Sequence, residues 1–97
     1  MDEKRKQKYL NFIQQTFKTF QEEEDQLYSL LVQHEELLTL ELGEVLSEFV
    51  RTSQIPKKEL GDYLLKFGKL LQGFTGGYPE INRELAITCY QNALSIL

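Results

Sequence analysis

Cys89 and His34 form the only thiol–imidazole combination in this chain that could act as a nucleophile and its base. In such a site a thiolate attacks the substrate, the imidazole accepts the thiol proton, and nearby donors stabilise the oxyanion. Cys89 instead falls in the middle of an expected helix, on its apolar stripe, where cysteine behaves as a small apolar residue. His34 is followed by two glutamates on another expected helix. The pattern therefore predicts no catalytic residue, and we expect a protein that is not an enzyme.

Carboxylates gather on both sides of position 34, which raises the question of a metal site. The carboxylates are Glu22, Glu23, Glu24, Asp25, Glu35 and Glu36. No second histidine or nearby cysteine completes a zinc set, and no Asp-x-Asp-x-Asp-Gly loop suits calcium. The glycine-rich segment 73–77 lacks the Gly-Lys-Ser/Thr ending of a phosphate-binding loop. The sequence therefore predicts neither a metal nor a cofactor.

Length and composition are typical of a soluble single domain. The chain has 97 residues, of which 41% are apolar and 27% charged, enough for one modest core. No apolar run approaches the length of a transmembrane helix, and the residues after Met1 lack the apolar core of a signal peptide. A single cysteine cannot form an internal disulfide, which favours a reducing compartment and predicts a cytoplasmic protein.

The net charge of −4 is unevenly distributed and argues against general nucleic-acid binding. Residues 1–20 contain five bases and two acids, residues 21–50 nine acids and no base, and residues 51–97 six bases and four acids. One interpretation is a set of solvated helix faces, with the basic beginning folded near the acidic middle. The other is an acidic docking surface for a basic protein partner. The sequence favours the first interpretation and leaves both open.

Under the second interpretation, acidic side chains would steer the partner and exposed aromatic rings would anchor it. The candidate partner-binding residues are Glu22, Glu23, Glu24, Asp25, Glu41, Glu44, Glu48, Tyr63, Phe74 and Tyr90. A membrane is a second candidate partner, because four bases within residues 4–8 precede an apolar stripe, as in interfacial helices. Those bases cluster at one end instead of along one face, so the pattern argues against membrane binding.

The spacing of apolar residues predicts an all-α fold. Neither proline nor glycine occurs in the first 42 residues, which are rich in helix formers, and no stretch alternates as a strand does. We expect a small bundle of about five helices, which would span 2–18, 19–38, 40–51, 56–72 and 79–97. The chain would form one domain, with residues 1–55 supplying three helices and residues 56–97 an antiparallel helix pair.

Local signals set the helix boundaries. Thr19-Phe20-Gln21-Glu22 has the form of a capping box, which predicts a break after residue 18. Because no proline or glycine enforces that break, a single helix through residue 36 is the alternative. Pro56 and Pro79 suit the first turns of the fourth and fifth helices, and three glycines within 73–77 predict the loop between them.

The expected fifth helix carries apolar residues up to the last position of the chain. Its predicted inward stripe is Ile81, Leu85, Ala86, Cys89, Tyr90, Ala93, Leu94 and Leu97. An apolar helix end needs a neighbour to cover it. We expect this end to pack on the fourth helix, or to be covered by further helices if the chain is a piece of a longer protein, or by a second copy.

Two segments resemble a known family. Residues 2–14 run Asp-Glu-Lys-Arg-Lys-Gln-Lys-Tyr-Leu-Asn-Phe-Ile-Gln, which is similar to the opening of a group of large bacterial, typically cyanobacterial, proteins. In that group a helical N-terminal region precedes tetratricopeptide repeats and often a caspase-like CHAT peptidase domain. The peptidase domain has no counterpart in these 97 residues.

Residues 84–94 resemble the second helix of a tetratricopeptide repeat, with small residues at Ala86 and Ala93 and the larger Tyr90 between them. Upstream, Leu64, Phe67, Gly68 and Leu71 match the pattern of the first helix. The separation of Gly68 from Ala86 exceeds that of the standard repeat, and residues 73–83 would be an insertion of the kind found in CHAT-linked repeats.

The resemblance implies a non-catalytic protein-interaction or scaffold module. The helix pair would act as the N-terminal cap of a tetratricopeptide-type array, because one repeat cannot bury its own faces. Partners would bind the pair or the acidic residues. The alternative is a self-associating structural or regulatory protein that forms a homodimer through its last helix.

Overall fold

Five α-helices and two single 3-10 turns make up the computed structural model, which describes residues 1–97. In chain order they are α1 (Glu3–Glu22), η1 (Glu24–Gln26), α2 (Leu27–Gln33), η2 (Glu35–Leu37), α3 (Leu40–Thr52), α4 (Lys57–Gly73) and α5 (Pro79–Ile96). The all-α prediction is confirmed. Pro79 opens α5 as expected, whereas Pro56 is the residue before α4 instead of its first helical residue.

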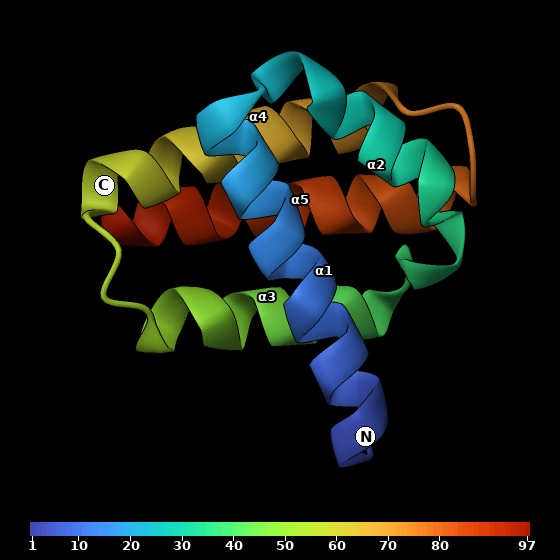
Figure 1. Ribbon diagram of the computed structural model, residues 1–97, viewed down its shortest axis with the longest axis horizontal. Coiled ribbons are helices and arrows are strands. Elements are labelled where there is room, and N and C mark those ends of the chain that lie inside the picture. Colours follow the sequence, from blue (N-terminus) through green and yellow to red (C-terminus); the bar gives the residue numbers. More distant parts are fainter.

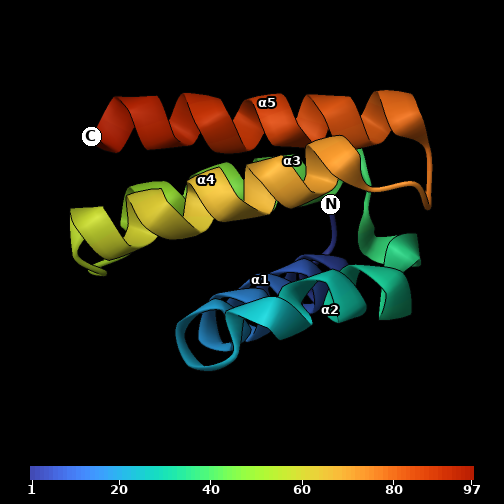
Figure 2. The ribbon, with the colours of Figure 1, turned by 90° about the horizontal axis from the view of Figure 1, so that it is seen from above.

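The helices form two layers. In Figure 1, α3, α5 and α4 lie alongside one another, with α5 between the other two, and α1 crosses in front of them. The turned view in Figure 2 shows α1 and α2 together as the second layer. The chain reverses direction after α4, so that α5 runs back along α4 as a closely packed antiparallel hairpin.

The first helix is longer than the sequence predicts. Asp2 caps its beginning by accepting a hydrogen bond from the backbone N–H of Arg5 at 2.8 Å. The helix continues through the expected capping box, because Phe17 and Phe20 pack edge-on against the ring of Tyr63. It ends at Glu23, whose φ of −146° lies outside the helical range. Both the break at residue 18 and the alternative of one helix through residue 36 are wrong.

The second helix is shorter than the sequence predicts. It buries Leu27, Leu30 and Leu31 and ends where His34 leaves helical geometry. A 3-10 turn then follows, and Leu38 reaches the core from outside the helix. Thr39 starts α3 by accepting a hydrogen bond from the backbone N–H of Leu42.

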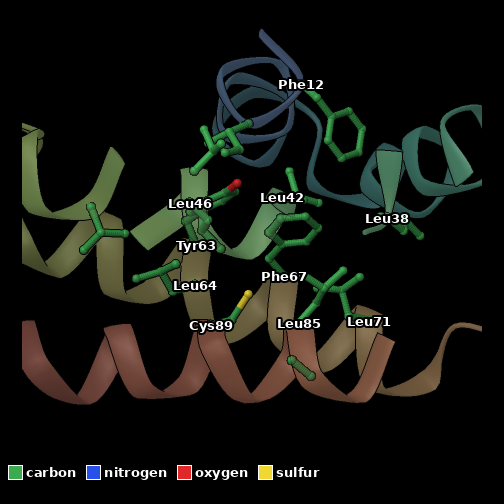
Figure 3. Close-up of a cluster of buried hydrophobic side chains, with 14 of the residues drawn as sticks. Phe12, Leu38, Leu42, Leu46, Tyr63, Leu64, Phe67, Leu71, Leu85 and Cys89 are labelled. Atoms are coloured by element: carbon green, nitrogen blue, oxygen red, sulfur yellow. The ribbon is translucent and has the colours of Figure 1, made fainter. Parts of the chain in front are cut away.

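The core lies between the two layers and takes side chains from all five helices. Figure 3 shows how Tyr63 and Phe67 of α4 fill the space between α1, α3 and α5. The hydroxyl of Thr16 donates to the carbonyl of Ile13 and accepts from the phenol of Tyr63 at 2.7 Å. That hydroxyl pair satisfies the only polar group of the largest fully buried side chain.

Candidate functional site

The structure separates the two residues that could have formed a nucleophile and base. Cys89 lies in the middle of α5 with its sulfur in the core (Figure 3), and burial raises the pKa of its thiol to about 12. His34 lies at the end of α2, with its ring against the edge of Phe12 at a centroid distance of 5.4 Å. Because the thiol stays protonated and has no imidazole beside it, this pair offers no activated nucleophile.

The carboxylates around position 34 do not converge. No group of three or more His, Cys, Asp or Glu side chains is placed to hold a metal ion. The carboxylate of Glu35 instead accepts a hydrogen bond from the backbone N–H of Gly77 at 2.7 Å, which ties η2 to the loop between α4 and α5. No helix combines the length and the apolar content that a membrane crossing requires.

The apolar stripe of α1 is turned inwards. Tyr9, Phe12 and Ile13 are buried, and Phe17 and Phe20 pack against the core. An interfacial helix needs such a stripe to be free for the acyl chains of a membrane. In this conformation α1 has no free apolar face to offer.

The basic beginning of α1 lies against the acidic residues of α3. Figure 1 shows the N-terminal end of α1 crossing and passing beyond α3. Arg5 pairs with Glu41 at 3.3 Å and Lys6 with Glu48 at 2.9 Å, where the hydrogen bond from the ammonium raises the pKa of Lys6. Two of the seven acidic candidate residues are thus partly neutralised within the chain, as the first interpretation of the charge pattern predicts. Glu44 is exposed and has no ion pair.

The other acidic candidates lie at the end of α1 and in η1. Glu22, Glu23, Glu24 and Asp25 are exposed and form no ion pair. Of these, Glu22 and Glu23 line a depression together with polar residues of α1, η1 and α2, and Leu30 is its one apolar member. This edge carries charge but offers no apolar anchor.

Two of the three predicted aromatic anchors are not available to a partner. Tyr63 has no exposed surface, because it fills the centre of the core beside Phe67. Phe74 is buried beneath the ring of Tyr28, with a centroid distance of 5.4 Å. Their assignment as partner-binding residues is therefore wrong for this conformation. Tyr90 is half-buried at the seam between α4 and α5.

Glycines set the close approach of α4 and α5. The side chain of Leu97 lies against Gly61, where an added Cβ would come within 2.9 Å of it. Tyr90 lies in the same way over Gly68, and its hydroxyl donates to the side-chain oxygen of Gln72 at 2.9 Å. These contacts fix the antiparallel register and place Leu65, between the two glycines, at the level of Leu94.

Large apolar side chains are exposed beside this seam. The outer face, as we define it, consists of Leu65 on α4, of Ile87, Tyr90 and Leu94 on α5, and of Leu97, which directly follows α5. The exposed fractions of Leu94 and Leu97 are 80% and 69%, and those of Leu65 and Ile87 are 44% and 39%. The prediction that Leu94 and Leu97 belong to the buried stripe is wrong. Tyr90 is the one predicted anchor that belongs to this face.

The outer face was missed because α5 has two apolar rows. One row, with Leu85, Cys89 and Ala93, faces the core. The other row steps by three, four and three residues through Ile87, Tyr90, Leu94 and Leu97. This spacing is typical of a seam between helices, but the spacing alone does not say which of the two rows faces the core.

A depression of about 450 Å³ lies where the end of α3, the beginning of α4 and the end of α5 meet. Its charged members, Arg51 and Lys57, are exposed. Because it holds no buried charged group that could fix a ligand, we do not assign it a function.

Comparison with known proteins gives no relative. No protein-family model matches the chain, no curated protein is similar to it, and no solved structure matches its fold.

Proposed function

We propose that this protein is a non-catalytic interaction module whose outer face binds helices of another polypeptide or of a further repeat. The observation that carries the proposal is the row Ile87, Tyr90, Leu94 and Leu97 on the closely packed hairpin, in which Tyr90 is half-buried and the other three side chains are exposed. Side chains of this size on a packed scaffold, at helix-pairing spacing, are typical of surfaces that another helix covers.

The hairpin also has features that support a stacking role. Gly68 lies under a large side chain, and Ala86 and Ala93 are buried at the packed side of α5. Both features are expected of a tetratricopeptide repeat, in which the next helix pair stacks on the preceding pair. On this reading the chain is the N-terminal cap of a helical array of the CHAT-linked kind. The buried thiol and the single cysteine suit the cytoplasm as its location.

Site-specific photocrosslinking tests the proposal. A photoreactive benzoylphenylalanine would replace Leu94 in one variant and Val32 in a matched control. Val32 is 51% exposed but lies on α2, outside the outer face. Irradiation of cells that produce each variant, followed by mass spectrometry of the adducts, should give a polypeptide adduct through position 94 and none through position 32. Absence of an adduct at position 94, or the same adducts from both positions, would contradict the proposal.

A further inference from the structure

We propose that the occupant of the outer face is a second copy of this chain, bound by a two-fold axis that passes near Leu65. This inference depends on the proposed function, because it names the partner of the same surface. In a two-fold interface each contact occurs twice with the copies exchanged, so the surface must be complementary to itself. Asp62 and Lys69 of α4 and the uncharged stretch of α5 support such complementarity.

The α5 side of the surface carries no charged side chain. Every residue of α5 after Glu84 is uncharged, which includes the whole stretch that carries the outer-face row. Leu65 lies beside it, at the level of Leu94. Interface centres are depleted of charged residues and enriched in apolar and aromatic ones, and this stretch fits that description.

Two exposed charges of α4, Asp62 and Lys69, lie on either side of Leu65 and have opposite sign, while the half-buried Lys66 is turned further away from α5. Asp62 lies three residues before Leu65 and Lys69 four residues after it, so the three side chains share one exposed row of the helix. An antiparallel copy centred on Leu65 brings Asp62 of one chain opposite Lys69 of the other, and the same pair forms again across the axis. Lys58 then faces the neutral end of the copy's α4 near Gln72.

Other arrangements are less favourable. A parallel alignment of the two rows would place like charges opposite each other, Asp62 on Asp62 and Lys69 on Lys69. Within one chain Asp62 has only the exposed Lys58 as a partner, at 3.0 Å, and Lys69 has no ion pair. In the antiparallel dimer Lys69 gains Asp62 of the other copy as a partner, and no buried ion pair has to be broken to form this contact.

The size of the surface sets the expected strength. Two helices of this length cover a footprint of about 25 Å by 20 Å, or roughly 500 Å² for each copy. The total of about 1,000 Å² is at the low end for specific interfaces, so we expect a dimer that dissociates in the micromolar range.

Sedimentation equilibrium and light scattering of the full chain, from micromolar to millimolar concentration, test the inference. The wild type should shift from monomer to dimer, and Leu94→Asp should remain a monomer while Val32→Asp behaves as the wild type.

Lys69→Glu should weaken the dimer by about tenfold or more, because like charges then meet at both ends of the axis. The double variant Asp62→Lys with Lys69→Glu should restore most of the loss, since the signs are exchanged on both copies. Circular dichroism and urea unfolding of each variant separate these effects from a loss of fold.

The outcomes distinguish this inference from the proposed function. A wild type that stays monomeric throughout, while position 94 crosslinks to another polypeptide, overturns the dimer and leaves the interaction module in place. A monomer with no adduct at position 94 overturns both. A dimer that persists in Leu94→Asp, or that the double charge exchange does not rescue, overturns the geometry proposed here.

Discussion

The ring of Tyr90 lies so close to Gly68 that a side chain at position 68 would have to displace it. An added Cβ would come within 2.8 Å of Cε1 of Tyr90 and 3.1 Å of Cβ of Cys89. Helices α4 and α5 can pack this closely because Gly68 has no side chain to hold the two helices apart. The same contact holds the ring of Tyr90 at the edge of the outer face, so one glycine positions both the hairpin and its surface.

Replacement of this glycine should therefore destabilise the protein, although alanine is the better helix former. We expect Gly68→Ala to lower the free energy of unfolding by about 1–3 kcal/mol, because overpacking outweighs the gain in helix propensity. Gly73→Ala is the matched control, since nothing lies within 4 Å of its added Cβ. That variant should be neutral, or more stable by up to about 1 kcal/mol. Urea unfolding measures both, and equal effects would show that the α4–α5 contact is looser than described.

The hydroxyl pair in the core should respond asymmetrically to removal of either member. In Tyr63→Phe the hydroxyl of Thr16 keeps its bond to the carbonyl of Ile13, so we expect a loss of about 1 kcal/mol. In Thr16→Val the phenol of Tyr63 is left buried without an acceptor, which costs about 1–3 kcal/mol. The double variant should lose less than the sum of the two single losses. A larger loss for Tyr63→Phe than for Thr16→Val would refute this assignment of donor and acceptor.

Much of this fold could be predicted from local signals. The bounds of α3, α4 and α5 follow within a few residues from Thr39, Pro56, the glycines of 73–77 and Pro79, each of which acts on its own stretch of backbone. The end of α1 could not be predicted in this way. Its capping-box pattern is real, but the packing of Phe17 and Phe20 on Tyr63 continues the helix through it, and that contact depends on a helix forty residues later.

The candidate site was harder to predict than the fold. Charge pairing between the beginning of the chain and its middle was foreseen, and Arg5–Glu41 and Lys6–Glu48 realise it. The outer face was not foreseen, because a sequence pattern cannot say which of two apolar rows on α5 turns inwards. The orientation of α5 depends on the helices that pack against it. Leu85 packs against Gly43 of α3, and Tyr90 and Leu97 pack against the glycines of α4.

The buried thiol should make stability depend on alkaline pH. The pKa of Cys89 is raised by burial from an ordinary 9.0 to about 12, so the thiol ionises first in the unfolded chain. Its contribution is complete below pH 9 and is lost as the pH rises towards 12, by about 1.4 kcal/mol for each pH unit. Burial raises the pKa of Tyr63 as well, which adds a loss in the same direction above pH 10. We expect Cys89→Ala to begin its decline only above pH 10 in urea unfolding.

Thiol labelling gives an independent check of the same residue. In the native protein Cys89 should react with a disulfide reagent only as fast as the chain opens, and in urea it should react at once, because its sulfur has no exposed surface. Rapid labelling of the native protein at neutral pH would contradict both the burial of the thiol and its raised pKa.

The loop between α4 and α5 depends on a glycine in a left-handed conformation. Gly77 has a φ of +67°, and its backbone N–H donates to the carboxylate of Glu35. We expect Gly77→Ala to cost about 1–2 kcal/mol in unfolding free energy, because a Cβ disfavours this region of φ. Gly77→Asn should cost less, since asparagine adopts the left-handed conformation more readily than alanine. Neither substitution causes a clash at Cβ, because the nearest atom to an added Cβ, Oδ1 of Asn82, is 3.6 Å away. Glu35→Ala should also destabilise the protein, because it removes the acceptor of the Gly77 N–H. In the Gly77→Ala background the effect of Glu35→Ala should be smaller, because the strained backbone no longer holds that N–H against the carboxylate. Equal stability of the alanine and asparagine variants at position 77 would show that the loop relaxes out of the left-handed conformation.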